Sequence, residues 1–137
     1  MATTIRRIYY YNTRVRDRPG EAYKRLSQLR TLGVNLVAFV LFPEGPMNTR
    51  ITLFPEDTAK LAHEANKAGW KVDGPHPALL VQGDDELGAL EGIHETLFEA
   101  DVNVAVSSGV ADGRGGFGYV VYIEPEQYER AVKALGV

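Results

Sequence analysis

Apolar residues recur along the first half of the chain in two rhythms, one typical of strands and one typical of helices. Residues 8–15 are rich in aromatic and β-branched side chains, which predicts a strand. Ala22, Tyr23, Leu26, Leu29 and Leu32 follow at helical spacing, with Gly33 where a helix C-cap is expected. The pattern then predicts strands over 34–42 and 49–54, a helix over 57–68, and a short fourth strand over 70–72.

The second half of the chain repeats this order of elements. It predicts a strand over 78–82, a helix over 87–100, strands over 102–108 and 117–123, and a helix from Pro125. It has no counterpart of the fourth strand, whereas residues 3–7 precede the first strand as a surplus. A missing strand leaves a sheet edge open, so we expect that edge to be covered by the N-terminal segment or by another chain.

A shift of 68 residues superposes many distinctive positions of the two halves. The matched pairs are Asp17/Asp85, Gly20/Gly88, Leu29/Leu97, Val34/Val102, Asn35/Asn103, Leu36/Val104 and Gly45/Gly113. Pro55-Glu56 then meets Pro125-Glu126 at a shift of 70, which predicts two extra residues in the glycine-rich hairpin of the second copy. We therefore expect a tandem duplication, with one unit over 1–73 and a second over 74–137.

Composition excludes several classes of protein. The 137 residues are 45% apolar and 24% charged, as in ordinary globular domains. Without cysteine there can be no disulfide and no thiolate site. The longest apolar run, 36–42, is far short of the ~20 residues that span a bilayer, and the N-terminus lacks a signal-peptide core. We expect a cytoplasmic protein with no membrane partner.

The two halves carry opposite charge. Residues 1–68 contain 11 Lys and Arg against 6 Asp and Glu, whereas residues 69–137 contain 4 against 12. Complementary potentials favour contact between unlike halves, within one chain or between chains. Drift after duplication is the alternative explanation.

Two short motifs, each present in both halves, resemble those of the ACT domain. They are Asp17-Arg18-Pro19-Gly20 with Gly33-Val34-Asn35-Leu36, and Asp85-Glu86-Leu87-Gly88 with Asp101-Val102-Asn103-Val104. The resemblance implies an α+β fold with two ferredoxin-like βαββαβ units in tandem. Each would have an antiparallel sheet with helices on one face, and the second unit would lack its last strand.

The resemblance also implies a non-catalytic regulatory module that binds a small ligand, commonly an amino acid, where ACT units meet. The ligand-binding residues implied by position are Asp17, Arg18, Pro19, Gly20, Asn35, Asp85, Glu86, Leu87, Gly88 and Asn103. Helix N-terminal N–H groups favour a carboxylate there, and an Asn amide both donates and accepts hydrogen bonds. The alternative is that these residues serve only as turns and caps.

The two predicted loops differ in sign. Arg14, Arg16 and Arg18 surround the first, and Asp84, Asp85 and Glu86 form the second. A site that draws on both could bind a zwitterion, with guanidinium on carboxylate and acid on ammonium. The alternative is that these charges are solvated strand ends.

The expected partners follow from the same resemblance. We expect a homo-oligomer, a dimer or larger, whose regulated enzyme would be another chain, and we expect no cofactor and no metal. A pure assembly module without a ligand remains an alternative. A metalloenzyme is a further one, although His63, His76 and His94 have no metal-ligand spacing.

RNA binding is a competing interpretation. The segment from Gly116 to Tyr122 resembles the RNP1 motif of RNA-recognition domains, which stacks bases on exposed aromatic side chains. Residues 78–82 contain no aromatic for the partner motif, and the half that carries the segment is acidic. Because phosphate binding needs positive charge, we do not expect a nucleic-acid partner.

Overall fold

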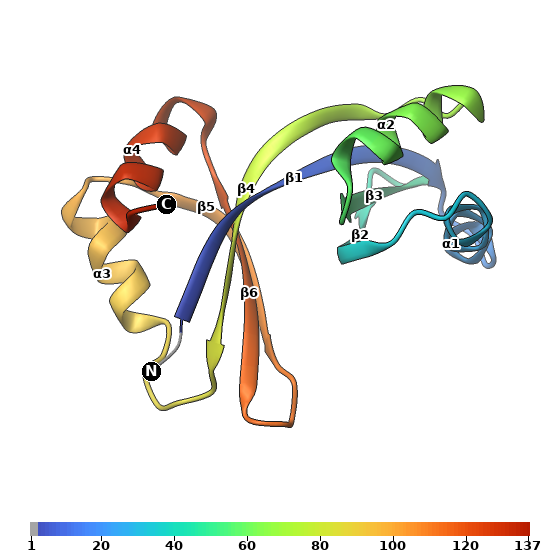
Figure 1. The fold of residues 1–137 in the computed structure, drawn as a ribbon. Helices are drawn as coiled ribbons and strands as arrows, with labels where there is room; N and C mark the ends of the chain where they lie inside the picture. The colour runs from blue at the N-terminus through green and yellow to red at the C-terminus, as the bar shows by residue number, and fades with distance from the viewer. Residues whose placement is uncertain (1–2) are drawn as a thin grey trace. The chain divides into compact units, whose positions relative to one another are not determined.

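The computed structural model describes residues 3–137 (Figure 1). The chain forms two compact units. One unit consists of residues 9–76, and the other of residues 3–8 with 77–137. Two long strands, β1 (Thr3–Arg16) and β4 (Asp73–Asp84), contribute residues to both units. The division expected from the sequence, 1–73 and 74–137, differs chiefly in where it puts the first residues of β1.

The unit of residues 9–76 is an antiparallel sheet with two helices. Within it the strand order is β2-β3-β1-β4. Both helices pack on one face of the sheet, because Leu29 and Leu61 join the same buried cluster as Tyr11, Ile51 and Leu53. The further elements of this unit are α1 (Glu21–Thr31), β2 (Leu36–Glu44), β3 (Asn48–Pro55) and α2 (Thr58–Lys67).

The unit of residues 3–8 and 77–137 has the corresponding order β1-β4-β6-β5. Leu97 and Val132 from its helices are buried with Val81 and Val121 from its strands, so both helices again cover one face. The further elements of this unit are α3 (Glu91–Glu99), β5 (Val104–Ala111), β6 (Gly116–Ile123) and α4 (Pro125–Leu135).

Residues 3–8 occupy the sheet edge that the second half leaves open. The hydroxyl of Thr4 donates to the carbonyl oxygen of Gln82 at 3.4 Å, and Ile5 packs against the core of this unit. Arg7 reaches Glu129 at 3.5 Å. The N-terminal segment therefore covers the edge, which is one of the two possibilities expected from the sequence.

The internal repeat is visible in the backbone hydrogen bonds. At the exit of the first helix of each unit, the Val34 N–H donates to Leu29 and the Val102 N–H to Leu97, both at 2.9 Å. The residue before each valine has a left-handed backbone, with φ of 73° at Gly33 and 58° at Asp101. The halves thus share local geometry even where the residue types differ.

The predicted insertion of two residues in the second hairpin is wrong. Leu36 pairs with Pro55 in one unit, and Val104 pairs with Ile123 in the other, so the two hairpins match at a shift of 68 throughout. The helices that follow begin at Thr58 and Pro125, 67 positions apart. Pro55 and Pro125 therefore do not correspond, since one ends a strand and the other begins a helix, where its fixed φ is suited to the first turn.

The predicted strand over 70–72 is also wrong. The Trp70 N–H donates to the Ala65 carbonyl at 2.9 Å and closes the end of α2, so its neighbours belong to the helix exit. β4 begins only at Asp73 and continues unbroken to Asp84, across the expected boundary. The apolar residues Trp70 and Val72 produced a strand-like pattern because both pack against the core.

The helix expected from Leu87 starts later, at Glu91. Gly88 has φ of 74°, a left-handed conformation that cannot be part of an α-helix. The Ala89 and Glu91 N–H groups instead donate to Glu86 and Gly88, three positions earlier, and form turns. Apolar spacing alone does not reveal this break.

Candidate functional site

The first predicted loop leads directly into α1. Gly20 has φ of 90° and precedes the first helical residue, Glu21. Arg18 Nε lies 3.2 Å and Lys24 Nζ 3.3 Å from the Glu21 carboxylate. The hydrogen bond from Arg18, reinforced by Lys24, lowers the pKa of Glu21. The loop thus already holds a carboxylate of its own beside its arginine, while Asp17 and Pro19 are exposed.

Asn35, the other predicted residue of this unit, lies beyond the opposite end of α1. An eleven-residue helix is about 16 Å long, so Gly20 and Asn35 do not meet within the unit. The Asn35 side chain donates to Glu56 Oε2 at 2.5 Å, and its carbonyl accepts from the Glu56 N–H at 2.9 Å. These bonds fasten the start of β2 to the segment before α2.

The second predicted loop borders a hollow of about 490 Å³. Asp85, Glu86 and Gly88 line it from the loop, together with Glu91 from α3. Phe117 and residues 109–111 contribute an apolar wall from the strands. Its lining includes three carboxylates and, among the described residues, no Lys, Arg or His. A hollow of this kind suits a ligand that presents a cation and a small apolar group.

Leu87 and Asn103 do not belong to this hollow. The Leu87 side chain is fully exposed. Asn103 follows α3 and donates its backbone N–H to Gln127 Oε1 at 2.9 Å, which connects the start of the strand to α4. The structure therefore brings together three of the five residues predicted in this unit.

Two of the three aromatic residues of the RNP1-like segment, Phe117 and Tyr119, face the core and not an open face. Tyr119 is buried in the core beneath the helices, and Phe117 packs against the same core. The Tyr119 hydroxyl lies 2.6 Å from Nε2 of His94. Since base stacking needs exposed aromatics, this arrangement disfavours the RNA interpretation.

Among residues 3–137, no group of three or more His, Asp or Glu side chains is arranged to hold a metal ion. His76 lies 2.9 Å from the Asp73 carboxylate, and His94 contacts Tyr119. Two of the three histidines considered above thus contact side chains outside any metal-binding cluster.

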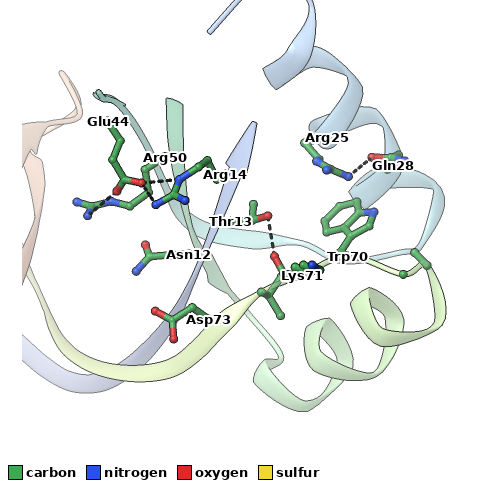
Figure 2. A pocket seen from close by; sticks show the side chains of 13 residues that line it. Asn12, Thr13, Arg14, Arg25, Gln28, Glu44, Arg50, Trp70, Lys71 and Asp73 are labelled. Atoms are coloured by element: carbon green, nitrogen blue, oxygen red, sulfur yellow. Dashed lines mark hydrogen bonds and ion pairs between the residues drawn. The ribbon is translucent and has the colours of Figure 1, made fainter. Parts of the chain in front are cut away.

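A larger pocket, of about 830 Å³, lies in the unit of residues 9–76 (Figure 2). It is bounded by β1, by α1, by the β2–β3 hairpin and by residues 68–73, which lead from α2 into β4. None of the ten ligand-binding residues implied by the ACT resemblance lines it, although Arg14, named above beside the first loop, does. The polar or aromatic side chains around it are Asn12, Thr13, Arg14, Arg25, Gln28, Glu44, Arg50, Trp70, Lys71 and Asp73.

Two sets of contacting side chains lie around this pocket (Figure 2). In one, Glu44 accepts hydrogen bonds from Arg14, through Nε at 2.6 Å, and from Arg50 at 3.4 Å. In the other, the Arg25 guanidinium lies 4.6 Å from the centre of the Trp70 ring and donates to Gln28 at 3.2 Å. With Lys71 and Asp73, which belong to neither set, the lining has four cations and two carboxylates and carries net positive charge.

The repeat contained a signal for this pocket that the motif search missed. Positions 12, 13 and 25 are Asn, Thr and Arg, but their counterparts at a shift of 68 are Leu80, Val81 and Ile93. Matched positions that are apolar in one copy and polar in the other indicate that they pack in a core in one unit and line a pocket in the other. Alignment of the two halves for differences, rather than identities, would have found it.

Comparison with known proteins finds no match among family models and none among the curated proteins. Solved structures do match over nearly the whole chain. Protein BT0572 from Bacteroides thetaiotaomicron superposes with a TM-score of 0.79 at 12% identity, covering 98% of this chain and 88% of that one.

Two further matches are subunits of aspartate kinases. The regulatory subunit of aspartate kinase from Thermus thermophilus, in its ligand-free form, gives a TM-score of 0.66 at 12% identity, over 98% of this chain and 94% of that one. The chain described here therefore shares the fold of that regulatory subunit, an ACT-like fold. A structure of aspartokinase alpha and beta subunits gives 0.56 at 18% identity, over 100% and 99% of the two chains.

The ACT resemblance of the sequence is thereby confirmed for the fold, as an α+β arrangement with an antiparallel sheet and four helices. Within residues 3–137, no helix is long and apolar enough to cross a bilayer.

Proposed function

We propose that this protein is a non-catalytic regulatory module that binds a small amino compound, most simply an amino acid, in the hollow beside Asp85, Glu86 and Gly88. The observation that carries the proposal is the hollow itself. A loop predicted to bind ligand lines a space of about 490 Å³ that contains three carboxylates and an apolar wall. An ammonium group would pair with the carboxylates, and an aliphatic side chain would contact Phe117 and Val110.

The proposed architecture is two ACT units, each a complete βαββαβ set. In the unit of residues 77–137, β4 provides the first strand, and residues 3–8 of β1 provide the last. The contacts of Thr4 and Ile5 support this assignment. The chain would then be a tandem pair in which the N-terminus completes the C-terminal copy.

We further propose that the module acts on a partner enzyme and assembles as a homo-oligomer. Support for a partner enzyme comes from the similar structures, which are a regulatory subunit of aspartate kinase and the alpha and beta subunits of aspartokinase. A ligand would change the degree of oligomerisation only to the extent that its affinities for the smaller and the larger assembly differ.

A thermal-shift screen of the proteinogenic amino acids tests the ligand. We expect at least one of them to raise Tm, because binding to the native state alone stabilises it. Glu86→Gln combined with Glu91→Gln should abolish the rise, whereas Glu95→Gln, an exposed position on α3 that does not line the hollow, should preserve it. Gly88 is a poor target because its left-handed φ would strain any replacement.

Two outcomes would count against the proposal. If no amino acid changes Tm, the module is better described as an assembly unit without this ligand. If the rise survives in the double variant, the ligand binds elsewhere and the hollow is the wrong site.

A further inference from the structure

We infer that the pocket bounded by β1, α1 and residues 68–73 is a second ligand site, which binds a small organic anion carrying a carboxylate or phosphate group. The inference goes beyond the proposed function, because it concerns the other unit, residues of opposite charge and a ligand of another class. All the lining residues lie within residues 12–73, in one compact unit. Its volume of about 830 Å³ is within the range of small-molecule sites.

The first step of the argument is the surplus of hydrogen-bond donors. Glu44 is shared by the guanidinium groups of Arg14 and Arg50. One carboxylate offers about four lone-pair positions, whereas two guanidiniums carry ten N–H donors. The Nε of Arg50 is buried without a hydrogen-bond partner among the described residues. The set therefore retains one positive charge, and Arg14, whose side chain is exposed, offers further donors to an anionic acceptor.

The second step is that the other cations lack acidic partners. Among residues 3–137, neither Arg25 nor Lys71 forms an ion pair. Arg25 is held against Trp70, and the Lys71 backbone is held by Thr13, whose hydroxyl donates to the Lys71 carbonyl at 3.0 Å. Both residues are thus positioned by contacts that leave their charge unneutralised.

The third step compares the two copies. The matched positions of the other unit place Leu80, Val81 and Ile93 where this unit has Asn12, Thr13 and Arg25. Leu80 and Val81 are buried, and Ile93 packs on a core. Apolar residues at these positions are thus compatible with the fold. Polar side chains at these positions pack less well than apolar ones. We expect them where they bind a ligand.

The geometry also indicates how the ligand would lie. Its anionic group would meet the cations that line the pocket, which include Arg25 and Lys71 as well as Arg14 and Arg50. A guanidinium binds carboxylate and phosphate in a bidentate way. The ligand's apolar part would contact the Trp70 ring and Val72, which line the same space. Figure 2 shows the Arg14–Glu44–Arg50 set and the Arg25–Trp70 pair around one pocket.

Trp70 gives a direct readout, because it is the only tryptophan of the chain. We would titrate the intact protein with inorganic phosphate, succinate and citrate and follow Trp70 fluorescence, with sodium chloride at matched ionic strength as the control. At least one of the three should give a saturable change, and its affinity should fall as salt rises. The phosphate and carboxylate arms distinguish the two kinds of anion.

Matched variants locate the site. Arg25→Gln and Lys71→Gln should each weaken binding about tenfold or more, because each removes a charged hydrogen-bond donor. Arg30→Gln on the same helix and Lys67→Gln on α2 make the same change of charge outside the pocket and should bind as the unchanged protein does. Thermal melts establish that every variant is folded. Weaker binding by either folded pocket variant is enough to locate the site.

The inference is overturned if none of the three anions gives saturable binding, if chloride reproduces the change, or if both pocket variants bind like their controls. Glu86→Gln with Glu91→Gln keeps this test separate from the proposed function. That double variant should lose the amino-acid response and retain the anion response, so either proposal can fail without the other.

Discussion

The units of residues 9–76 and of 3–8 with 77–137 share the same strand order and the same hydrogen bonds at their helix exits. They differ in what lies beside the first helix of each unit. Arg25 of α1 faces a pocket, whereas its counterpart Ile93 of α3 packs against a core. The backbone of a repeat can thus be retained while its side chains divide into one polar and one apolar version.

The largest expected effect tests the part of the comparison that is shared. Leu29 and Leu97 are matched core residues, 2% and 1% exposed. Leu29→Ala and Leu97→Ala should each lower the free energy of unfolding by about 2–5 kcal/mol, because each leaves a cavity in a packed core. Urea denaturation followed by circular dichroism measures the loss.

The exposed residue Leu87 supplies the control for this pair. Leu87→Ala should change the free energy of unfolding by less than about 0.5 kcal/mol, since its side chain is already in solvent. A loss below about 1 kcal/mol for either core variant would show that the two helices are not equivalent in packing.

A smaller effect is expected where the copies share a conformation but not a residue. Asp101 adopts φ of 58° at the position that Gly33 occupies with φ of 73°. Asp101→Gly should raise the free energy of unfolding by about 0.5–1 kcal/mol, because glycine adopts this conformation without steric cost. Gly33→Ala should lower it by about 1 kcal/mol. Changes of the same sign in thermal melts would contradict this explanation.

The smallest effect concerns two carboxylates at matched positions. Glu44 binds the arginines of the pocket, whereas Asp112 accepts hydrogen bonds from the backbone N–H groups of Arg114 at 2.6 Å and Gly116 at 3.1 Å. These bonds, led by that of Arg114, lower the pKa of Asp112. The ionised side chain therefore stabilises its hairpin.

Because the folded pKa is depressed, this contribution is present above the unfolded pKa of about 3.9 and is lost as the pH falls through the folded value. The difference in stability between the protein and Asp112→Asn should be constant near neutral pH and should shrink below about pH 4. Unfolding curves measured across that range test the sign. A difference that grows in acid would mean that the hydrogen bonds are not charge-dependent.

Sequence reasoning predicted each helix and most strands because apolar spacing records which face is buried. It failed at 70–72, where the apolar residues pack at a helix exit and not in a strand. It also matched Pro55 to Pro125 by identity, although strand pairing places them out of register. At 70–72 the pattern recorded burial correctly but not the backbone conformation, whereas the proline match recorded neither, since Pro55 is buried and Pro125 is exposed.

The candidate site was predicted in part. Asp85, Glu86 and Gly88 line a hollow, because a loop motif is local and its residues remain together. Asn35 and Asn103 lie at the far ends of their helices and make structural contacts instead. The positive pocket was not predicted, since its residues come from β1, β2, β3, α1 and the segment after α2, which no single motif spans.

The sequence by itself determined the duplicated order of elements, the buried faces and the left-handed glycines that end strands and helices, because these depend on neighbours close along the chain. Only the tertiary structure decided that residues 3–8 complete the second unit and that Arg14, Arg25 and Lys71 face one pocket. The first arrangement joins segments about 75 positions apart in the sequence, and the second joins residues up to 57 positions apart. Contacts between such distant positions are set by chain folding and packing.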